Sequence, residues 1–251
     1  MTMTILLACL LAQTGHRAGV DESPKNQDLR VHLLPGATVN TMSELEDSLT
    51  HSWAAAHQGT FTVRTDGKKG KWIKIRNCRE MNQIDAKAAD TRPADAWDAL
   101  NAVSYWCRGL QAIPRAKSSK RSLLAEILAA KNPAAYIPAS VVDIVNAGDL
   151  ADKDPDIEAS KKAHTSVSWA KFDPALKLGD VQAKDRIDFE GKDYVAAVSY
   201  YAAGDFNGDG IEDLLVEISI RSFDASQGDG AFFILTRTKP KGLLTVIETF
   251  R

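Results

Sequence analysis

The chain has 251 residues, of which 44% are hydrophobic and 25% are charged, so it is long enough to bury one large core or two small ones. Its 31 basic and 33 acidic residues give a formal net charge of −2. This balance argues against a nucleic-acid-binding protein, which needs a basic surplus to neutralise phosphates. No apolar run in the sequence approaches the roughly 20 residues that a transmembrane helix needs.

The N-terminus is typical of a targeting segment. An apolar run over residues 5–12 (ILLACLLA) is followed by a polar stretch up to residue 27, which resembles the apolar centre of a secretory signal. Residues 1–20 are therefore expected to be a signal-like segment, and the protein is expected to be periplasmic or secreted. Leu6 to Cys9 also resembles a bacterial lipoprotein box, so a lipid anchor at Cys9 is an alternative. A buried N-terminal strand or helix is a third.

Residues 28–150 are expected to form an α-rich region that contains one β-hairpin. A capping box at Thr41–Glu44 precedes apolar residues at helical spacing, which predicts a helix over residues 42–56. Residues 61–64 and 72–75 alternate apolar and polar side chains around a glycine-containing turn. This pattern predicts the two strands of the hairpin.

A second helix is expected after the hairpin, because Thr91-Arg92-Pro93 has the form of a helix start. Its apolar stripe consists of Trp97, Leu100, Val103, Cys107 and Leu110. Cys78 and Cys107 are the cysteines outside the signal-like segment, and two cysteines in an exported domain predict a disulfide. Cys78 is expected to close the second strand, so the bond would pin the helix to the hairpin. Two unrelated buried thiols in a cytosolic protein are the alternative.

A basic segment follows at residues 115–121 (RAKSSKR). It is compatible either with a patch for an anionic ligand or a membrane surface, or with a solvated loop. Short helices are expected over residues 122–131 and 138–146. Residues 151–178 are expected to be a connecting segment, because residues 147–163 are polar and charged and predict a boundary or a surface helix.

Residues 179–251 are expected to form a β-rich region. Four strand-like segments separated by Gly and Asp predict an antiparallel sheet; they are residues 194–201, 214–220, 231–235 and 243–247. The predicted fold class is therefore α+β, with a mainly helical N-terminal part, a β-hairpin and a C-terminal antiparallel sheet.

The segment between the first two of these strands has the composition of a calcium loop. Residues 205–213 follow the pattern D-x-N-x-D-G-x-x-D. Oxygen-bearing side chains at this spacing suit a hard cation, and Gly210 permits the sharp turn that lets the chain curl around one point. The expected ligands are the side chains of Asp205, Asn207, Asp209 and Asp213 and the backbone carbonyl of Ile211.

The loop departs from a complete EF-hand, because Val216 stands where a bidentate glutamate belongs and the flanks are strands. It resembles instead the EF-hand-like calcium loops of FG-GAP and VCBS repeats, whose signature runs G-D-F-N-G-D-G-x-x-D. The resemblance implies a bound Ca²⁺ and a loop that joins two strands of a β-rich extracellular module. Asp188 and Glu190 are candidates for the ligand that Val216 cannot supply.

No catalytic residue is predicted, because the sequence has no G-x-S-x-G, H-E-x-x-H or phosphate-loop motif. The first functional hypothesis is a non-enzymatic, exported calcium-binding protein that binds a protein partner. Its plan resembles envelope immunity and inhibitor proteins, which implies a toxic effector enzyme as the partner. A secreted hydrolase is an alternative, with a carboxylate pair among Asp185, Asp188 and Glu190. An adhesin or glycan-binding module is another.

Overall fold

The computed structural model describes most of the chain from Phe61 onward and a few residues before it. The described residues are 32–33, 45–46, 49, 61–65, 70–84, 89–92, 97–147, 154–182, 186–225 and 228–251. The signal-like segment and Cys9 lie outside them. Of the helix expected over residues 42–56, only residues 45, 46 and 49 are described, and these three are helical.

The fold is α+β, as predicted, and is built around a seven-stranded sheet whose described strands pair antiparallel. Six strands follow the order β10-β9-β8-β7-β6-β5, and β1 pairs with β7 beyond the end of β6. The four C-terminal strands were predicted, whereas β1, β5 and β6 were not. The strands are β1 (His32–Leu33), β5 (Lys177–Gln182), β6 (Arg186–Glu190), β7 (Tyr194–Gly204), β8 (Asp213–Ser222), β9 (Asp229–Thr236) and β10 (Thr245–Phe250).

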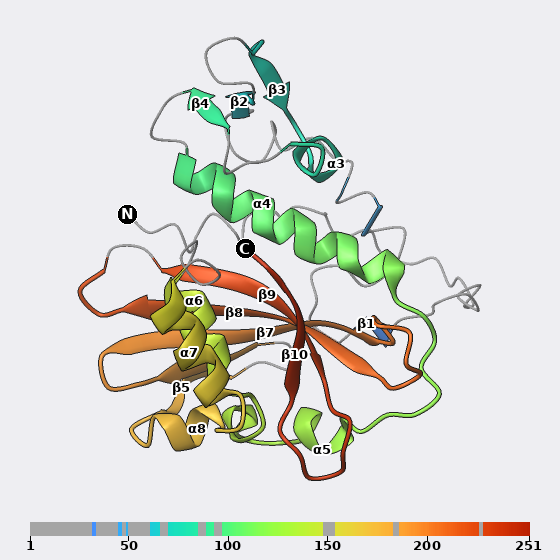
Figure 1. Ribbon diagram of the computed structural model, residues 1–251, viewed down its shortest axis with the longest axis vertical. Coiled ribbons are helices and arrows are strands. Elements are labelled where there is room, and N and C mark those ends of the chain that lie inside the picture. The colour runs from blue at the N-terminus through green and yellow to red at the C-terminus, as the bar shows by residue number, and fades with distance from the viewer. Residues whose placement is uncertain are drawn as a thin grey trace, which may run out of the picture.

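Helices cover both faces of this sheet (Figure 1). Successive side chains of a strand point to opposite faces, so Leu214 and Val216 belong to one core and Leu215 to another. The first core includes apolar residues of α5, α6 and α8, and the second includes those of α4. The helices are α4 (Trp97–Ala112), α5 (Ala125–Leu128), α6 (Ser140–Ala147), α7 (Pro155–His164) and α8 (Trp169–Phe172), with short 3-10 turns η5 (Ile113–Arg115) and η6 (Pro133–Ala135).

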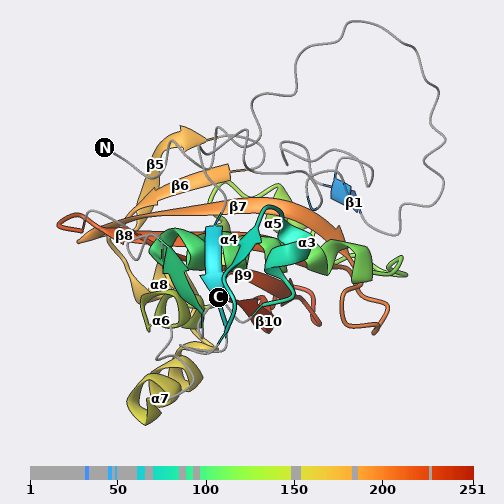
Figure 2. The ribbon, with the colours of Figure 1, turned by 90° about the horizontal axis from the view of Figure 1, so that it is seen from above.

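The predicted short helices after the basic segment are confirmed as α5 and α6, with α5 shorter than expected. The surface helix anticipated before residue 163 is α7, which has no buried residue and projects from the body of the molecule (Figure 2). Asp154 caps it, accepting a hydrogen bond from the backbone N–H of Asp156, and Pro155 occupies its first turn. None of the described helices has the length and apolar character that crossing a membrane would require.

A small three-stranded sheet lies on the other side of α4 from the large sheet (Figure 1). Its strands β2 (Phe61–Arg64) and β3 (Ile73–Ile75) form the predicted hairpin, and β4 (Asp90–Arg92) pairs with β2. The predicted helix start at Thr91 is wrong. Thr91 and Arg92 are strand residues that pair with Val63 and Thr62, and the expected second helix is α4, which is described from Trp97 onward.

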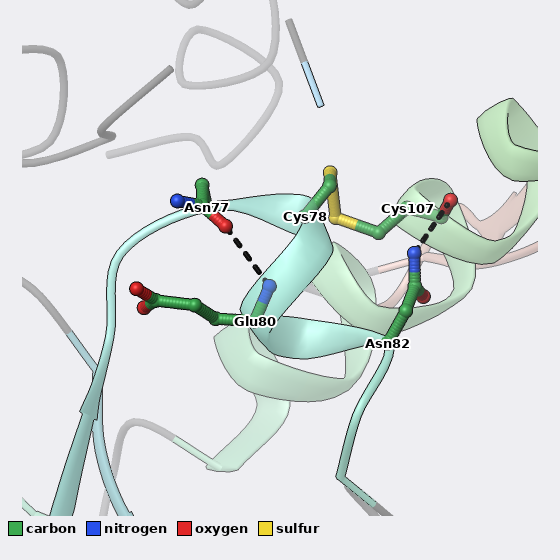
Figure 3. The surroundings of a disulfide bond; sticks show 5 residues. All are labelled: Asn77, Cys78, Glu80, Asn82 and Cys107. Carbon is green, nitrogen blue, oxygen red and sulfur yellow. Dashed lines mark hydrogen bonds between the residues drawn. A yellow bond between two sulfur atoms is a disulfide. The ribbon is translucent and has the colours of Figure 1, made fainter. Parts of the chain in front are cut away.

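The predicted disulfide joins Cys78 to Cys107, and both cysteines are fully buried (Figure 3). Cys78 was expected to close the second strand of the hairpin. It instead begins the short helix α3 (Cys78–Met81). The reason is local: the Asn77 side chain accepts a hydrogen bond from the backbone N–H of Glu80 at 2.9 Å, which caps a helix at this point. The Asn82 side chain also donates a hydrogen bond to the Cys107 carbonyl at 3.4 Å. The disulfide and this hydrogen bond together tie α3 to α4.

Candidate metal-binding loop and its surroundings

Residues 205–213 connect β7 to β8, as the sequence predicted. Gly204 and Asp213 are the last pair of the β7–β8 ladder, so the two ends of the loop lie side by side. The conformation of the loop therefore decides how the two longest strands of the sheet meet at this end.

The backbone of the loop curls around the side chain of Asp205. One carboxylate oxygen of Asp205 accepts a hydrogen bond from the Gly208 N–H at 2.6 Å, and the other accepts one from the Gly210 N–H at 2.9 Å. Gly208 and Gly210 have φ angles of 83° and 84°. Glycine adopts this left-handed region at little cost, so glycine at both positions favours the curl.

Asp213 is fully buried at the end of the loop. Burial raises the pKa of its carboxyl, and the nearby Asp209 carboxylate acts in the same direction, against the Thr236 hydroxyl and the Phe206 N–H. The Phe206 N–H donates to Oδ2 at 2.9 Å. Thr236 lies close enough to affect the pKa of Asp213. However, Oγ1 of Thr236 and Oδ1 of Asp213 both have no hydrogen-bond partner of good geometry. Such a buried oxygen is costly unless a donor or a cation compensates it.

The other expected ligands are bonded to one another. Oδ1 of Asn207 accepts from the Asp209 N–H at 2.9 Å, and its side-chain amide donates to Oδ2 of Asp209 at 3.0 Å. Oδ1 of Asp209 accepts from the Ile211 N–H at 2.7 Å. Within the described part of the chain, no group of three or more Cys, His, Asp or Glu side chains is arranged to hold a metal ion. The donor types fit calcium, but a shell would form only if these side chains turned to a common point.

The basic segment that follows α4 is fixed against this loop. Lys117 forms an antiparallel bridge with Asp205, in which the backbone N–H groups donate to the partner carbonyls at 2.8 and 2.9 Å. The N–H groups of Lys120 and Arg121 donate to the Gly210 carbonyl at 2.8 and 3.1 Å. The Glu212 N–H donates to the Arg121 carbonyl at 2.8 Å. We call residues 117–121 the strap; its backbone is hydrogen-bonded to the loop, although Lys117, Lys120 and Arg121 are exposed.

Asp188 and Glu190 cannot complete a calcium shell here. Both lie in β6, where Asp188 pairs with Ala197 of β7. Ala197 is seven residues from Gly204, the last residue of β7, which corresponds to about 23 Å along a strand. Their carboxylates are instead paired with Arg186 at 2.8 Å and with Lys177 at 3.2 Å. Asp185, the third residue of the expected carboxylate group, lies outside the described residues.

The sequence did not single out a second acidic site under α4. Glu217 is 8% exposed and accepts hydrogen bonds from the hydroxyls of Tyr105 at 3.2 Å and Tyr201 at 2.9 Å. Burial raises the pKa of Glu217, and the two tyrosine hydrogen bonds act in the opposite direction. The available signal was one glutamate between apolar neighbours in a strand, Val216 and Ile218.

A histidine also lies near a carboxylate, since Nδ1 of His164 is 2.8 Å from a carboxylate oxygen of Asp143. The Ser160 hydroxyl is 3.1 Å from Asp143 and 3.4 Å from the same Nδ1. A Ser-His-Asp relay needs the serine at the opposite ring nitrogen. These three residues therefore connect α6 to α7 without forming such a relay.

Comparison with protein-family models, with curated proteins and with solved structures finds no match for the chain.

Proposed function

We propose that residues 205–213 bind one calcium ion, which fixes the junction of β7 and β8. The observation that carries the proposal is the fully buried Asp213 carboxylate, whose Oδ1 has no hydrogen-bond partner of good geometry, at the end of a loop shaped by two left-handed glycines. A dipositive ion would compensate that oxygen and the neighbouring carboxylates of Asp205 and Asp209. The ligands remain those expected from the sequence, with Asn207 and the Ile211 carbonyl completing the set.

The role proposed for the ion is structural. Gly204 and Asp213 are paired where the loop leaves the sheet. An ion held by Asp205 and Asp213 would therefore hold the ends of β7 and β8 together. Calcium at about 100 times its dissociation constant would add roughly 2.7 kcal/mol to the free energy of unfolding by linkage. This is a large share of a typical total of about 5–15 kcal/mol.

The test is a thermal melt of the wild-type protein in calcium and in chelator, together with calorimetric titration of calcium. We expect a higher midpoint in calcium and uptake of one ion. Asp209→Asn keeps an acceptor for the Ile211 N–H but removes a charge, and it should lose most of the calcium-dependent gain. Asp224→Asn is the matched control, because Asp224 is an exposed aspartate in the connection between β8 and β9. An unchanged midpoint without calcium uptake would refute the proposal.

The wider role that we propose is that of an exported, non-enzymatic protein that binds a protein partner, as immunity and inhibitor proteins do. The buried Cys78–Cys107 disulfide supports an oxidising compartment, periplasmic or extracellular. The described carboxylates on which the hydrolase alternative depended, Asp188 and Glu190, each have a cationic partner, so no observation favours that alternative.

The partner hypothesis is tested by affinity capture from the envelope fraction of the source cell, followed by an assay of the captured protein. We expect an enzyme that forms a stoichiometric complex with this chain and loses activity in it. Retention of full activity in a saturated complex would contradict an inhibitory role.

A further inference from the structure

The strap and the proposed calcium loop hold each other at both ends. Five backbone hydrogen bonds connect them, two at Asp205 where the loop begins and three at Gly210 and Glu212 near its end. The strap follows η5 and α4 directly along the chain. Any change in the curl of the loop must therefore either move the strap or break these hydrogen bonds.

The strap also brings positive charge to the loop. A Cβ atom added to Gly208 would lie 3.6 Å from Nζ of Lys117, and one added to Gly210 would lie 3.5 Å from Cδ of Lys120. Both lysines are exposed, and neither ammonium has a hydrogen bond or ion pair with the described residues. The Lys117 ammonium therefore lies beside Gly208 of the proposed calcium loop, without being committed to one of the loop's carboxylates.

We propose that the strap is the second wall of the calcium site, so that bound calcium fastens the strap to the loop and Lys117 weakens calcium binding. This inference rests on the proposed function of residues 205–213. The first part follows from the five shared hydrogen bonds, because an ion that fixes Asp205 and Gly210 also fixes their strap partners. The second part follows from charge, since an ammonium group repels a dipositive ion at short range. Through the strap, calcium would stabilise the attachment of α4 to the large sheet as well as the β7–β8 junction.

Hydrogen exchange of individual amides tests the coupling. In calcium we expect slower exchange at the strap amides of Lys117, Lys120 and Arg121, along with the loop amides of Gly208 and Gly210. The Ala225 amide donates a hydrogen bond to the Ser222 carbonyl in the connection between β8 and β9. It is the internal control and should not change. Slower exchange confined to the loop would overturn the inference and leave the calcium site standing. Unchanged exchange everywhere would overturn the calcium site itself.

Calorimetric titration of Lys117→Met with calcium tests the charge effect. We expect binding about three- to tenfold tighter than in the wild type at low ionic strength, with the difference shrinking as salt is added. The matched control is Lys171→Met, because Lys171 is also exposed but lies far from the loop. It belongs to α8, where Trp169 donates a hydrogen bond to Tyr194 at the opposite end of β7. Lys117→Gln provides a second, polar replacement. Unchanged or weaker binding in both Lys117 variants, with the loop's exchange pattern retained, would refute the role of Lys117.

Discussion

The two faces of the large sheet are covered in different ways. The face toward α6 and α8 is packed through apolar side chains, such as Trp169 against Phe189 with ring centroids 5.5 Å apart. The face toward α4 is also packed through apolar side chains, among them Leu215 and Phe232. It adds contacts that each depend on one geometry, which are the approach of Gly109 to Phe232 and the hydrogen bonds between Tyr105, Tyr201 and Glu217. The Cys78–Cys107 bond in turn holds α3 on α4.

The difference teaches how the two layers are specified. Apolar burial is non-directional and scales with the area removed from water, so the α6–α8 face should tolerate substitutions that conserve volume. The position of α4 depends in addition on a missing Cβ and a buried carboxylate, and a covalent bond ties it to α3. Removing these one at a time measures how much each contributes to holding α4 in place.

The largest effect is expected from the disulfide. The bond joins residues separated by 29 positions, and closing such a loop is worth about 3–4 kcal/mol in the chain-entropy model. The double variant Cys78→Ala/Cys107→Ala should lose about this much in urea unfolding. Wild-type protein in reductant should unfold at the same midpoint as the variant. A loss below about 1 kcal/mol would show that the neighbouring core already holds α3 on α4.

The close approach of α4 at Gly109 should give the next effect. A Cβ at this position would lie 2.3 Å from Cγ of Phe232, which is closer than packed atoms can come. Overpacking of this kind costs about 1–3 kcal/mol, partly offset by the better helix propensity of alanine, worth about 1 kcal/mol. We therefore expect Gly109→Ala to lower the urea midpoint, although alanine is the better helix former.

A double-mutant cycle shows whether the steric contact is the cause. Phe232→Ala should remove the clash, because it removes the Cγ and Cδ atoms that a Cβ at Gly109 would meet, so Gly109→Ala should cost less in that background than in the wild type. Equal costs in both backgrounds would mean that the glycine is needed for another reason.

The sequence predicted the elements whose signals are local. The strands from Tyr194 onward contain continuous or alternating apolar residues bounded by Gly and Asp, and the structure has a strand at each of those positions. The hairpin of β2 and β3 was predicted for the same reason, whereas the Cys78–Cys107 pair followed from there being two cysteines outside the signal-like segment. Within the loop, the glycine at position six was expected to permit a turn, and Gly210 indeed has a positive φ.

The sequence did not predict features that depend on pairing across the chain. Thr91-Arg92-Pro93 has the form of a helix start, yet its first two residues pair with β2, because tertiary pairing outweighs a local preference. The basic strap was expected to be a patch or a solvated loop, but its partner loop begins at Asp205, far along the sequence. The Tyr105–Glu217 contact likewise joins residues 112 positions apart. One sequence without such pairing information cannot place them together.

The smallest effect is expected at Glu217, and its sign with pH distinguishes a buried charge from an ordinary surface carboxylate. Burial raises the pKa of Glu217, while hydrogen bonds from Tyr201 and Tyr105 and the charge of Arg186 oppose that rise. The folded protein therefore keeps this proton to a higher pH than the unfolded chain does. The contribution of Glu217 to the free energy of unfolding is thus most favourable at low pH, and it falls as the pH rises from the unfolded pKa through the folded pKa.

Glu217→Gln cannot ionise, so in urea titrations from pH 4 to 8 its stability relative to the wild type should rise with pH. A stability difference for Glu217→Gln that stays flat across this range would mean that the two tyrosine hydrogen bonds compensate the buried charge, and that α4 is fixed at no electrostatic cost.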